Sequence, residues 1–187
     1  MRKDDLIIVV DMQNVYCKGE PWACLDTEGA AENILKILDK ASPKQVVLTE
    51  FLAPKDPVGA WKVYNETFRD INENEYMNEL VPQLNERAAA YKVYGKSTFS
   101  SLKVPEIQKL ARKAGRVVVT GVVAECCVLA TAFDAVDLGC HVVYLTDAVS
   151  GFDHEKERGA MLAMQGLAPV QSTVMTTREY LDEHTRP

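Results

Sequence analysis

The feature that most constrains the fold is a regular alternation, along the chain, of short apolar runs and longer amphipathic stretches. The apolar runs are rich in β-branched residues and occur at Leu6–Val10, Gln45–Leu48, Val117–Thr120 and His141–Leu145, with weaker ones near Ala90–Val93 and Val170–Val174. Continuous apolar strands of this kind are buried on both faces, as they are in a parallel sheet. The alternation therefore predicts six strands joined by crossover helices.

The amphipathic stretches between these runs have the spacing of helices with one buried face. They are Gly29–Lys40, Pro105–Ala114, Val128–Leu138, His154–Leu167 with Asp153 as its N-cap, and a last short helix through Leu181 capped by Thr176 or Thr177. Helices on both faces of a mostly parallel sheet make a three-layer α/β/α fold. Because no repeat or linker interrupts the pattern, we expect a single domain over residues 1–187.

Composition and charge narrow the class of protein. Of the 187 residues, 47% are hydrophobic and 26% charged, which is typical of a globular domain. The net charge of −6, with basic residues spread along the chain, argues against nucleic acid or an anionic membrane as a partner. The first apolar run ends at Asp11, too soon for a signal peptide or a membrane span. Five cysteines, two of them adjacent, favour free thiols in a reducing cytoplasm.

Three residues that can carry chemistry follow three different strands. Asp11 comes directly after Leu6–Val10, Lys96 just beyond the weak strand near Ala90–Val93, and Cys127 after Val117–Thr120 and a short turn. Taken singly, each has an ordinary explanation as a turn former, a solvated lysine or a buried core cysteine. Parallel strands place their carboxyl ends at one edge, however, so we expect these three side chains to converge there.

Cys127 begins an Ala-rich helical stretch, and a helix N-terminus carries partial positive charge. With Lys96 nearby, this environment predicts a thiol that is largely ionised near neutral pH, and that becomes less reactive when Asp11 is replaced by Asn. The helical pattern by itself does not decide whether Cys126 or Cys127 faces the edge of the sheet.

Three segments resemble the isochorismatase-like cysteine hydrolases, which include nicotinamidases, N-carbamoylsarcosine amidases and ureidoacrylate and biuret amidohydrolases. They are Val9–Asn14, Lys96 with the aromatic three residues later and Ser100, and Gly121–Ala132. The resemblance implies that Cys127, directly before a Val and four residues before a Thr-Ala pair, is the nucleophile. It further implies that Asp11 is the general base and that Lys96 supports it. The same resemblance implies a cis peptide between Val122 and Val123, and an oxyanion hole formed by the N–H groups of Val123 and Cys127.

The chain also departs from that family. Nicotinamidases carry an Asp-x-His metal cluster where this chain has Thr49–Ala53, and Glu125 replaces an Asp two residues before the nucleophile. The histidines His141, His154 and His184 lack the spacing of metal ligands, so we expect no metal and no other cofactor. For substrate contacts we name Trp61, in a loop-like stretch from Pro57, together with Phe99 and Gln13. The role of the segment from Cys17 to Cys24 cannot be interpreted from the sequence.

These observations together predict a metal-independent cysteine amidohydrolase that cleaves a small, non-peptide amide or ureido compound through a thioester intermediate. We expect a cytoplasmic homo-oligomer. One alternative is a vinyl-ether hydrolase of the isochorismatase type, which uses acid catalysis and needs no nucleophilic cysteine. Another is a homologue without turnover, either a binding protein or a redox sensor that uses Cys126 and Cys127.

Overall fold

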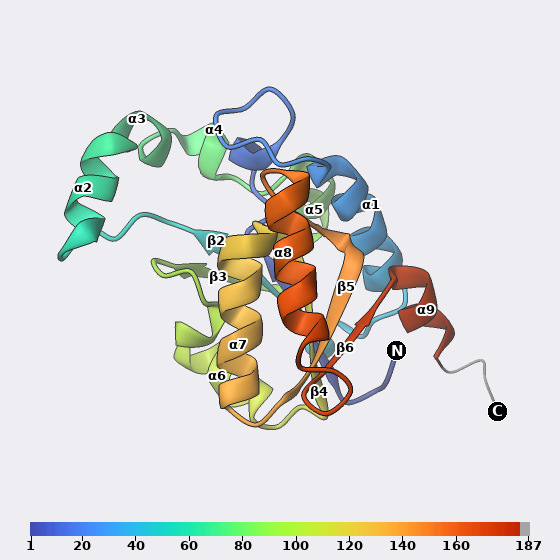
Figure 1. Cartoon of the computed structure of the whole chain (residues 1–187). Helices are drawn as coiled ribbons and strands as arrows, with labels where there is room; N and C mark the ends of the chain where they lie inside the picture. The colour runs from blue at the N-terminus through green and yellow to red at the C-terminus, as the bar shows by residue number, and fades with distance from the viewer. Residues whose placement is uncertain (184–187) are drawn as a thin grey trace.

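The computed structural model describes residues 1–183, which build a six-stranded sheet with helices on both faces (Figure 1). The strands are β1 (Asp5–Val10), β2 (Val46–Phe51), β3 (Lys92–Lys96), β4 (Arg116–Val122), β5 (His141–Ser150) and β6 (Ser172–Met175). Their order is β3-β2-β1-β4-β5-β6, and all neighbouring strands pair in parallel. The predicted three-layer α/β/α architecture is confirmed, and its strand order reverses between β1 and β4, where sheets of this type bind ligands.

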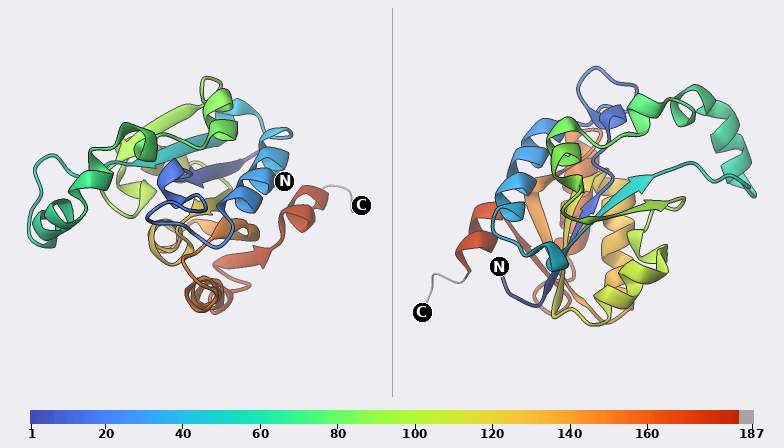
Figure 2. Two further views of the ribbon diagram at one scale, coloured as in Figure 1. Left: turned by 90° about the horizontal axis from the view of Figure 1, so that it is seen from above. Right: turned by 180° about the vertical axis from the view of Figure 1, so that it is seen from behind.

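Two hydrophobic cores form, one on each face of the sheet. The first core lies under α1 (Thr27–Leu38), α5 (Pro82–Ala88) and α9 (Thr177–Asp182), and the second under α6 (Pro105–Ala111), α7 (Leu129–Asp137) and α8 (His154–Gln165), as Figures 1 and 2 show. Asp153 caps α8 as predicted, because its side chain accepts a hydrogen bond from the N–H of Lys156. Within residues 1–183 no helix is both long and apolar enough to span a bilayer.

Strands β2, β3, β4 and β5 all end beyond the apolar runs that mark them in the sequence, and β3 thereby includes Lys96. Strand β2 continues to Phe51, which lies opposite Lys96 of β3, and β5 continues to Ser150, which lies opposite Val122 of β4. Their last residues are more polar than the core runs, so hydrophobic pattern alone ends these strands too early. The extra length carries Thr49 and Phe51 to the edge where the predicted site residues gather.

The segment between β2 and β3 differs most from the prediction. A loop-like stretch was expected through Trp61, but the chain forms α2 (Ala60–Thr67), α3 (Arg69–Asn72) and α4 (Glu75–Asn78) before α5, and α2 projects away from the sheet (Figure 1). None of these three helices has a fully buried residue, and α3 and α4 have only 4 residues each, which is too short for a helical period. The feature of the sequence that indicates α2 is the helical spacing of Trp61, Tyr64 and Phe68.

Candidate active site

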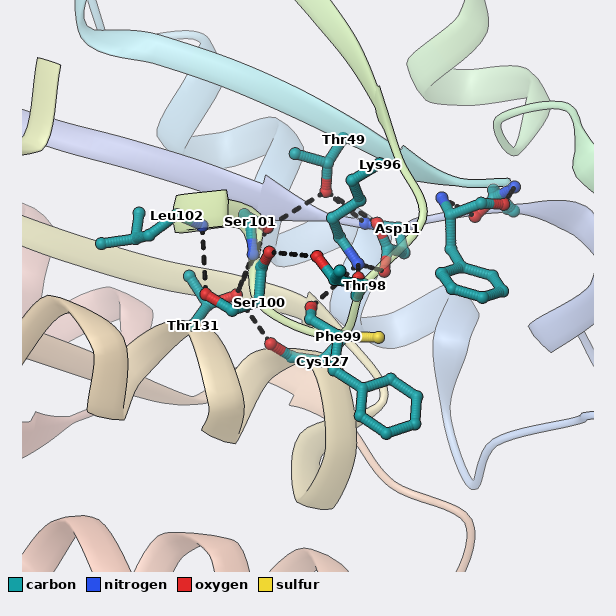
Figure 3. A network of polar contacts seen from close by, with 12 residues as sticks. Asp11, Thr49, Lys96, Thr98, Phe99, Ser100, Ser101, Leu102, Cys127 and Thr131 are labelled. Carbon is teal, nitrogen blue, oxygen red and sulfur yellow. Dashed lines mark hydrogen bonds and ion pairs between the residues drawn. The ribbon is translucent and has the colours of Figure 1, made fainter. Parts of the chain in front are cut away.

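Asp11 is the first residue after β1 and is completely buried at the carboxyl edge of the sheet. Its φ of 48° lies in the left-handed region, which aspartate tolerates better than most residues. Both carboxylate oxygens have partners: Oδ1 accepts a hydrogen bond from Thr49 Oγ1 at 2.7 Å, and Oδ2 lies 2.6 Å from Lys96 Nζ (Figure 3). The orientation of the carboxylate is therefore fixed from two neighbouring elements.

Lys96 ends β3, which is separated from β1 by β2, so its side chain crosses the end of β2 to reach Asp11. On the way its Nζ lies 5.4 Å from the ring centre of Phe51. The ammonium also donates hydrogen bonds to the carbonyl oxygens of Thr98 and Phe99, both at 2.9 Å. The ammonium is therefore held by one ion pair and two hydrogen bonds.

Cys127 lies in a π-helical turn, Ala124–Val128, that joins β4 to α7. Gly121 has a φ of +100°, and a Cβ at this position would lie 2.1 Å from the carbonyl oxygen of Val10. Only glycine therefore lets β4 approach the end of β1 so closely, which brings the turn beside Asp11. The predicted cis peptide between Val122 and Val123 is present.

A chain of hydroxyl groups joins the aspartate to the turn that carries Cys127. Thr49 Oγ1, which donates to Asp11, lies 3.4 Å from Ser101 Oγ, and Ser101 Oγ lies 3.3 Å from Thr131 Oγ1 (Figure 3). Thr131 in turn donates a 2.7 Å hydrogen bond to the carbonyl oxygen of Cys127. These buried hydroxyls fix the position of the turn relative to the carboxylate.

The thiol of Cys127 is almost fully buried, and Asp11 is close enough to act on its pKa. Burial and the negative charge of Asp11 raise the pKa of the Cys127 thiol well above its ordinary value, and the charge of Lys96 offsets this only in part. This direction is opposite to the ionised thiol expected from the sequence, because Lys96, the cation near the sulfur, is already paired with Asp11.

A cavity of about 350 Å³ lies beside the thiol. Aromatic, valine and cysteine side chains line it: Tyr16, Trp22, Phe51, Tyr64, Phe68, Phe99, Val123, Cys126, Cys127 and Phe152. Phe99 thus lines the cavity, as expected. Trp61 belongs to α2 and stands behind this wall, where its ring packs on Phe51 and Phe99 with centroid distances of 6.0 and 5.5 Å.

The expected substrate contact at Gln13 finds no support in the geometry, because its carboxamide is used by the main chain. Its Oε1 accepts a hydrogen bond from the N–H of Phe51 at 2.8 Å, while Nε2 donates to the carbonyl oxygens of Phe51 and Asn78 at 3.1 and 2.8 Å. Both amide hydrogens are therefore engaged. Gln13 ties the end of β2 to α4 and so holds Phe51 in the cavity wall.

Several site residues were missed in the sequence. Thr49 lies inside β2, and the alternation of the strand puts it with Phe51 on the site face and the half-buried Glu50 on the other. Trp22 comes from the segment between Cys17 and Cys24 that could not be interpreted. The sequence feature that could have indicated an aromatic pocket is the number of aromatic residues in segments that end near the same edge of the sheet.

Metal-binding side chains do not gather at this edge. Among residues 1–183, no three His, Cys, Asp or Glu side chains are grouped so that they could hold a metal ion. His141 forms hydrogen bonds with the Val170 carbonyl oxygen and Thr173, and His154 begins α8. His184 lies outside the described residues.

Solved structures with the same fold include several hydrolases. A cysteine hydrolase from Pseudomonas syringae pv. phaseolicola 1448A is 20% identical and has a TM-score of 0.80, with 96% of this chain and 91% of that chain covered. A zinc complex of pyrazinamidase from Pyrococcus horikoshii is 24% identical, with a TM-score of 0.73 and coverage of 92% and 99%. The MAR1 ribonuclease of Caenorhabditis elegans is 19% identical, with a TM-score of 0.72 and coverage of 96% and 80%.

Sequence comparison agrees with the fold. No curated protein matches the chain. The family model described as "Isochorismatase domain", however, matches residues 5–179, which is nearly the whole chain. The protein therefore belongs to the isochorismatase-like cysteine hydrolase family.

Proposed function

We propose that this protein is a metal-independent cysteine amidohydrolase that cleaves the C–N bond of a small, non-peptide amide or ureido compound. The observation that carries the proposal is the buried contact between the Cys127 thiol and Asp11, whose remaining contacts are with Lys96 and Thr49. A neutral thiol next to an oriented carboxylate is a nucleophile paired with its general base. The likeness to a pyrazinamidase, itself an amidase by name, supports this class of reaction.

In the first half-reaction, Asp11 accepts the thiol proton while the sulfur of Cys127 attacks the carbonyl carbon. Because the thiol is protonated at rest, proton transfer accompanies the attack. The N–H groups of Val123 and Cys127 are proposed to hold the oxyanion that forms. The protonated Asp11 then gives its proton to the leaving nitrogen, the C–N bond breaks, and a thioester remains on Cys127.

In the second half-reaction, water attacks the thioester while Asp11 accepts one of its protons. The C–S bond breaks, the proton passes from Asp11 to the sulfur, and a carboxylic acid leaves. Lys96 keeps its charge throughout and stabilises the ionised form of Asp11 between the steps.

The test is a screen for ammonia release from about fifty small amides and ureas, with Cys127→Ala and Cys126→Ser as a matched pair. Cys127→Ala should abolish release, whereas Cys126→Ser should keep most of it, and mass spectrometry should find an acyl group on Cys127 in the parent. Ammonia release that survives in Cys127→Ala would refute the mechanism.

Metal independence is part of the proposal, because Thr49–Ala53 offers no histidine where nicotinamidases carry their metal cluster. Activity should persist after chelation. Loss of activity on chelation that zinc restores would contradict it. We further propose a cytoplasmic homo-oligomer with no nucleic-acid or membrane partner.

The two alternatives predict different outcomes. A vinyl-ether hydrolase needs no thiol beside Asp11, and it would keep its activity in Cys127→Ala. A redox sensor would form a bond between Cys126 and Cys127 under peroxide. Burial and Glu125 raise the pKa of the Cys126 thiol, which disfavours oxidation at neutral pH.

A further inference from the structure

The cavity wall is built from aromatic rings that come from widely separated parts of the chain. Seven of the lining residues are Tyr, Trp or Phe. Trp22 links two sides of this wall, since its ring centre lies 5.9 Å from that of Tyr16 and 5.3 Å from that of Phe68. Tyr64 continues the contact to Phe51 at 5.9 Å. The segment between Cys17 and Cys24 thus contributes a pocket residue.

The cavity offers no cation to a bound ligand. None of its lining residues is basic. Lys96, at the base of the site, is ion-paired with Asp11 and donates hydrogen bonds to the carbonyl oxygens of Thr98 and Phe99. A carboxylate on the substrate would therefore gain no counterion from the wall, and it would also meet the negative charge of Asp11.

The polar groups of the wall are neutral. Burial, together with Cys127, raises the pKa values of both the Tyr16 and the Tyr64 hydroxyls, so neither ionises in the physiological range. Neutral hydroxyls can exchange hydrogen bonds with a carboxamide or a ring nitrogen, but they cannot balance a full charge.

The volume limits the size of the ligand. A cavity of about 350 Å³ corresponds to roughly a dozen water molecules at about 30 Å³ each.

We propose that the substrate is an uncharged primary amide with a small apolar acyl group, aromatic or branched aliphatic, and that amides carrying a carboxylate are excluded. This inference rests on the proposed amidohydrolase function and adds the class of acyl group.

Two isosteric amides test it directly. In 4-methylpentanamide an isopropyl group occupies the place of the carboxylate of succinamate, so the two differ in charge and hardly in shape. The value of kcat/KM should be at least about a hundredfold higher for 4-methylpentanamide, because succinamate buries an unpaired charge. Benzamide should also be cleaved.

Binding to Cys127→Ala, measured by calorimetry, separates this inference from the proposed function. Tighter binding of 4-methylpentanamide with no turnover by the parent would support the pocket assignment and overturn the amidase mechanism. Binding of succinamate as tight as that of 4-methylpentanamide, or no binding of either, would overturn the pocket assignment whatever the activity.

A charge introduced into the wall should shift the preference. Phe99 lines the cavity and is 47% exposed, so Phe99→Arg supplies a cation with little strain on the fold. It should raise kcat/KM for succinamate relative to 4-methylpentanamide by about tenfold or more. Phe133→Arg places the same change on α7 at a site 39% exposed and away from the cavity lining, and should leave the ratio unchanged. Phe99→Leu controls for loss of the ring. An unchanged ratio in Phe99→Arg would contradict the proposal.

Discussion

Strand β1 carries a buried aspartate at each end, Asp5 where it begins and Asp11 directly after it finishes, and the two are paired with different cations. At the amino end, Arg116 binds Asp5 with two hydrogen bonds, from Nε at 2.8 Å and from Nη2 at 3.0 Å. Asp5 Oδ2 also accepts hydrogen bonds from the Tyr180 hydroxyl and the Arg2 N–H at 2.9 and 2.7 Å. This carboxylate is saturated with donors.

The carboxyl end of the strand is arranged differently. Asp11 has one hydroxyl donor, Thr49, one ammonium, Lys96, and the Cys127 thiol. A lysine is a point charge that leaves acceptor capacity on its partner, whereas the guanidinium fork occupies both oxygens. An aspartate at the amino end of β1 thus stabilises the fold, whereas an aspartate at its carboxyl end can accept a proton.

The largest expected effect comes from making the same substitution at both ends. Asp11→Asn removes the acceptor for the thiol proton and should lower kcat/KM by about 10⁴-fold. Asp5→Asn should lower the free energy of unfolding and leave kcat/KM of the folded enzyme nearly unchanged. Steady-state kinetics on folded material measures both. Equal losses of kcat/KM in the two variants would contradict the separate roles assigned to Asp5 and Asp11.

The next effect is on stability at the amino end. Arg116→Met leaves Asp5 buried without its cation and should reduce the free energy of unfolding by about 3–5 kcal/mol in urea titrations. Arg178→Met is the control, because this arginine is 90% exposed and its contact with Asp182 is 3.8 Å long, so its loss should cost less than about 0.5 kcal/mol. Equal stabilities of the two variants would show that the buried ion pair does not hold this end together.

A third prediction concerns the charge state of the thiol at the carboxyl end. Because the pKa of Cys127 is raised, less thiolate is present at pH 7, and alkylation by iodoacetamide should accelerate about tenfold per pH unit from pH 7 to 9. Asp11→Asn removes a negative charge beside the sulfur and should increase the rate at pH 7, which reverses the expectation from sequence. Mass spectrometry of the peptide that carries Cys127, in a Cys126→Ser background, separates this rate from those of Cys17, Cys24 and Cys140. A rate that is already constant above pH 7 would show an ionised thiol.

The smallest effect concerns Glu183, which accepts hydrogen bonds from the outer side of Arg116 at 2.7 and 2.9 Å. The hydrogen bonds to Arg116 lower the pKa of Glu183 below its ordinary value of 4.5. Its contribution to stability is therefore present above pH 4.5 and is lost as the pH falls through the lower pKa of the folded state.

Glu183→Gln should accordingly cost about 1 kcal/mol or less at pH 7 and nothing in strong acid. Thermal unfolding of the two proteins across this pH range measures the difference. A difference that persists unchanged in strong acid would contradict an electrostatic origin.

Much of the architecture follows from local pattern. The buried runs of β1 and β4 are continuous β-branched segments, and a parallel sheet is the arrangement that covers both faces of such strands. Because parallel strands end at one edge, the convergence of Asp11, Lys96 and Cys127 also follows from their places in the chain. The choice of Cys127 over Cys126 rests on the resemblance to the family, because the helical pattern leaves both open.

Other features depend on contacts between distant residues, which no local pattern records. Thr49 lies 38 residues from Asp11, and only the pairing of β2 with β1 brings its hydroxyl to the carboxylate. Trp22 lies in the cavity wall because its ring packs against Tyr64 of α2 and against Phe68 at the end of α2. Gln13, close to Asp11 in sequence, turns instead to the main chain of Phe51.

The sequence by itself therefore determined the layers of the fold, the edge at which the site lies and the three residues that meet there. Only the tertiary structure decided that burial and Asp11 raise the pKa of the thiol and that the pocket is aromatic with no basic lining residue. The physical reason is that strand and helix formation follow periodicity along the chain, whereas protonation and ligand preference depend on burial and on which charges are already paired.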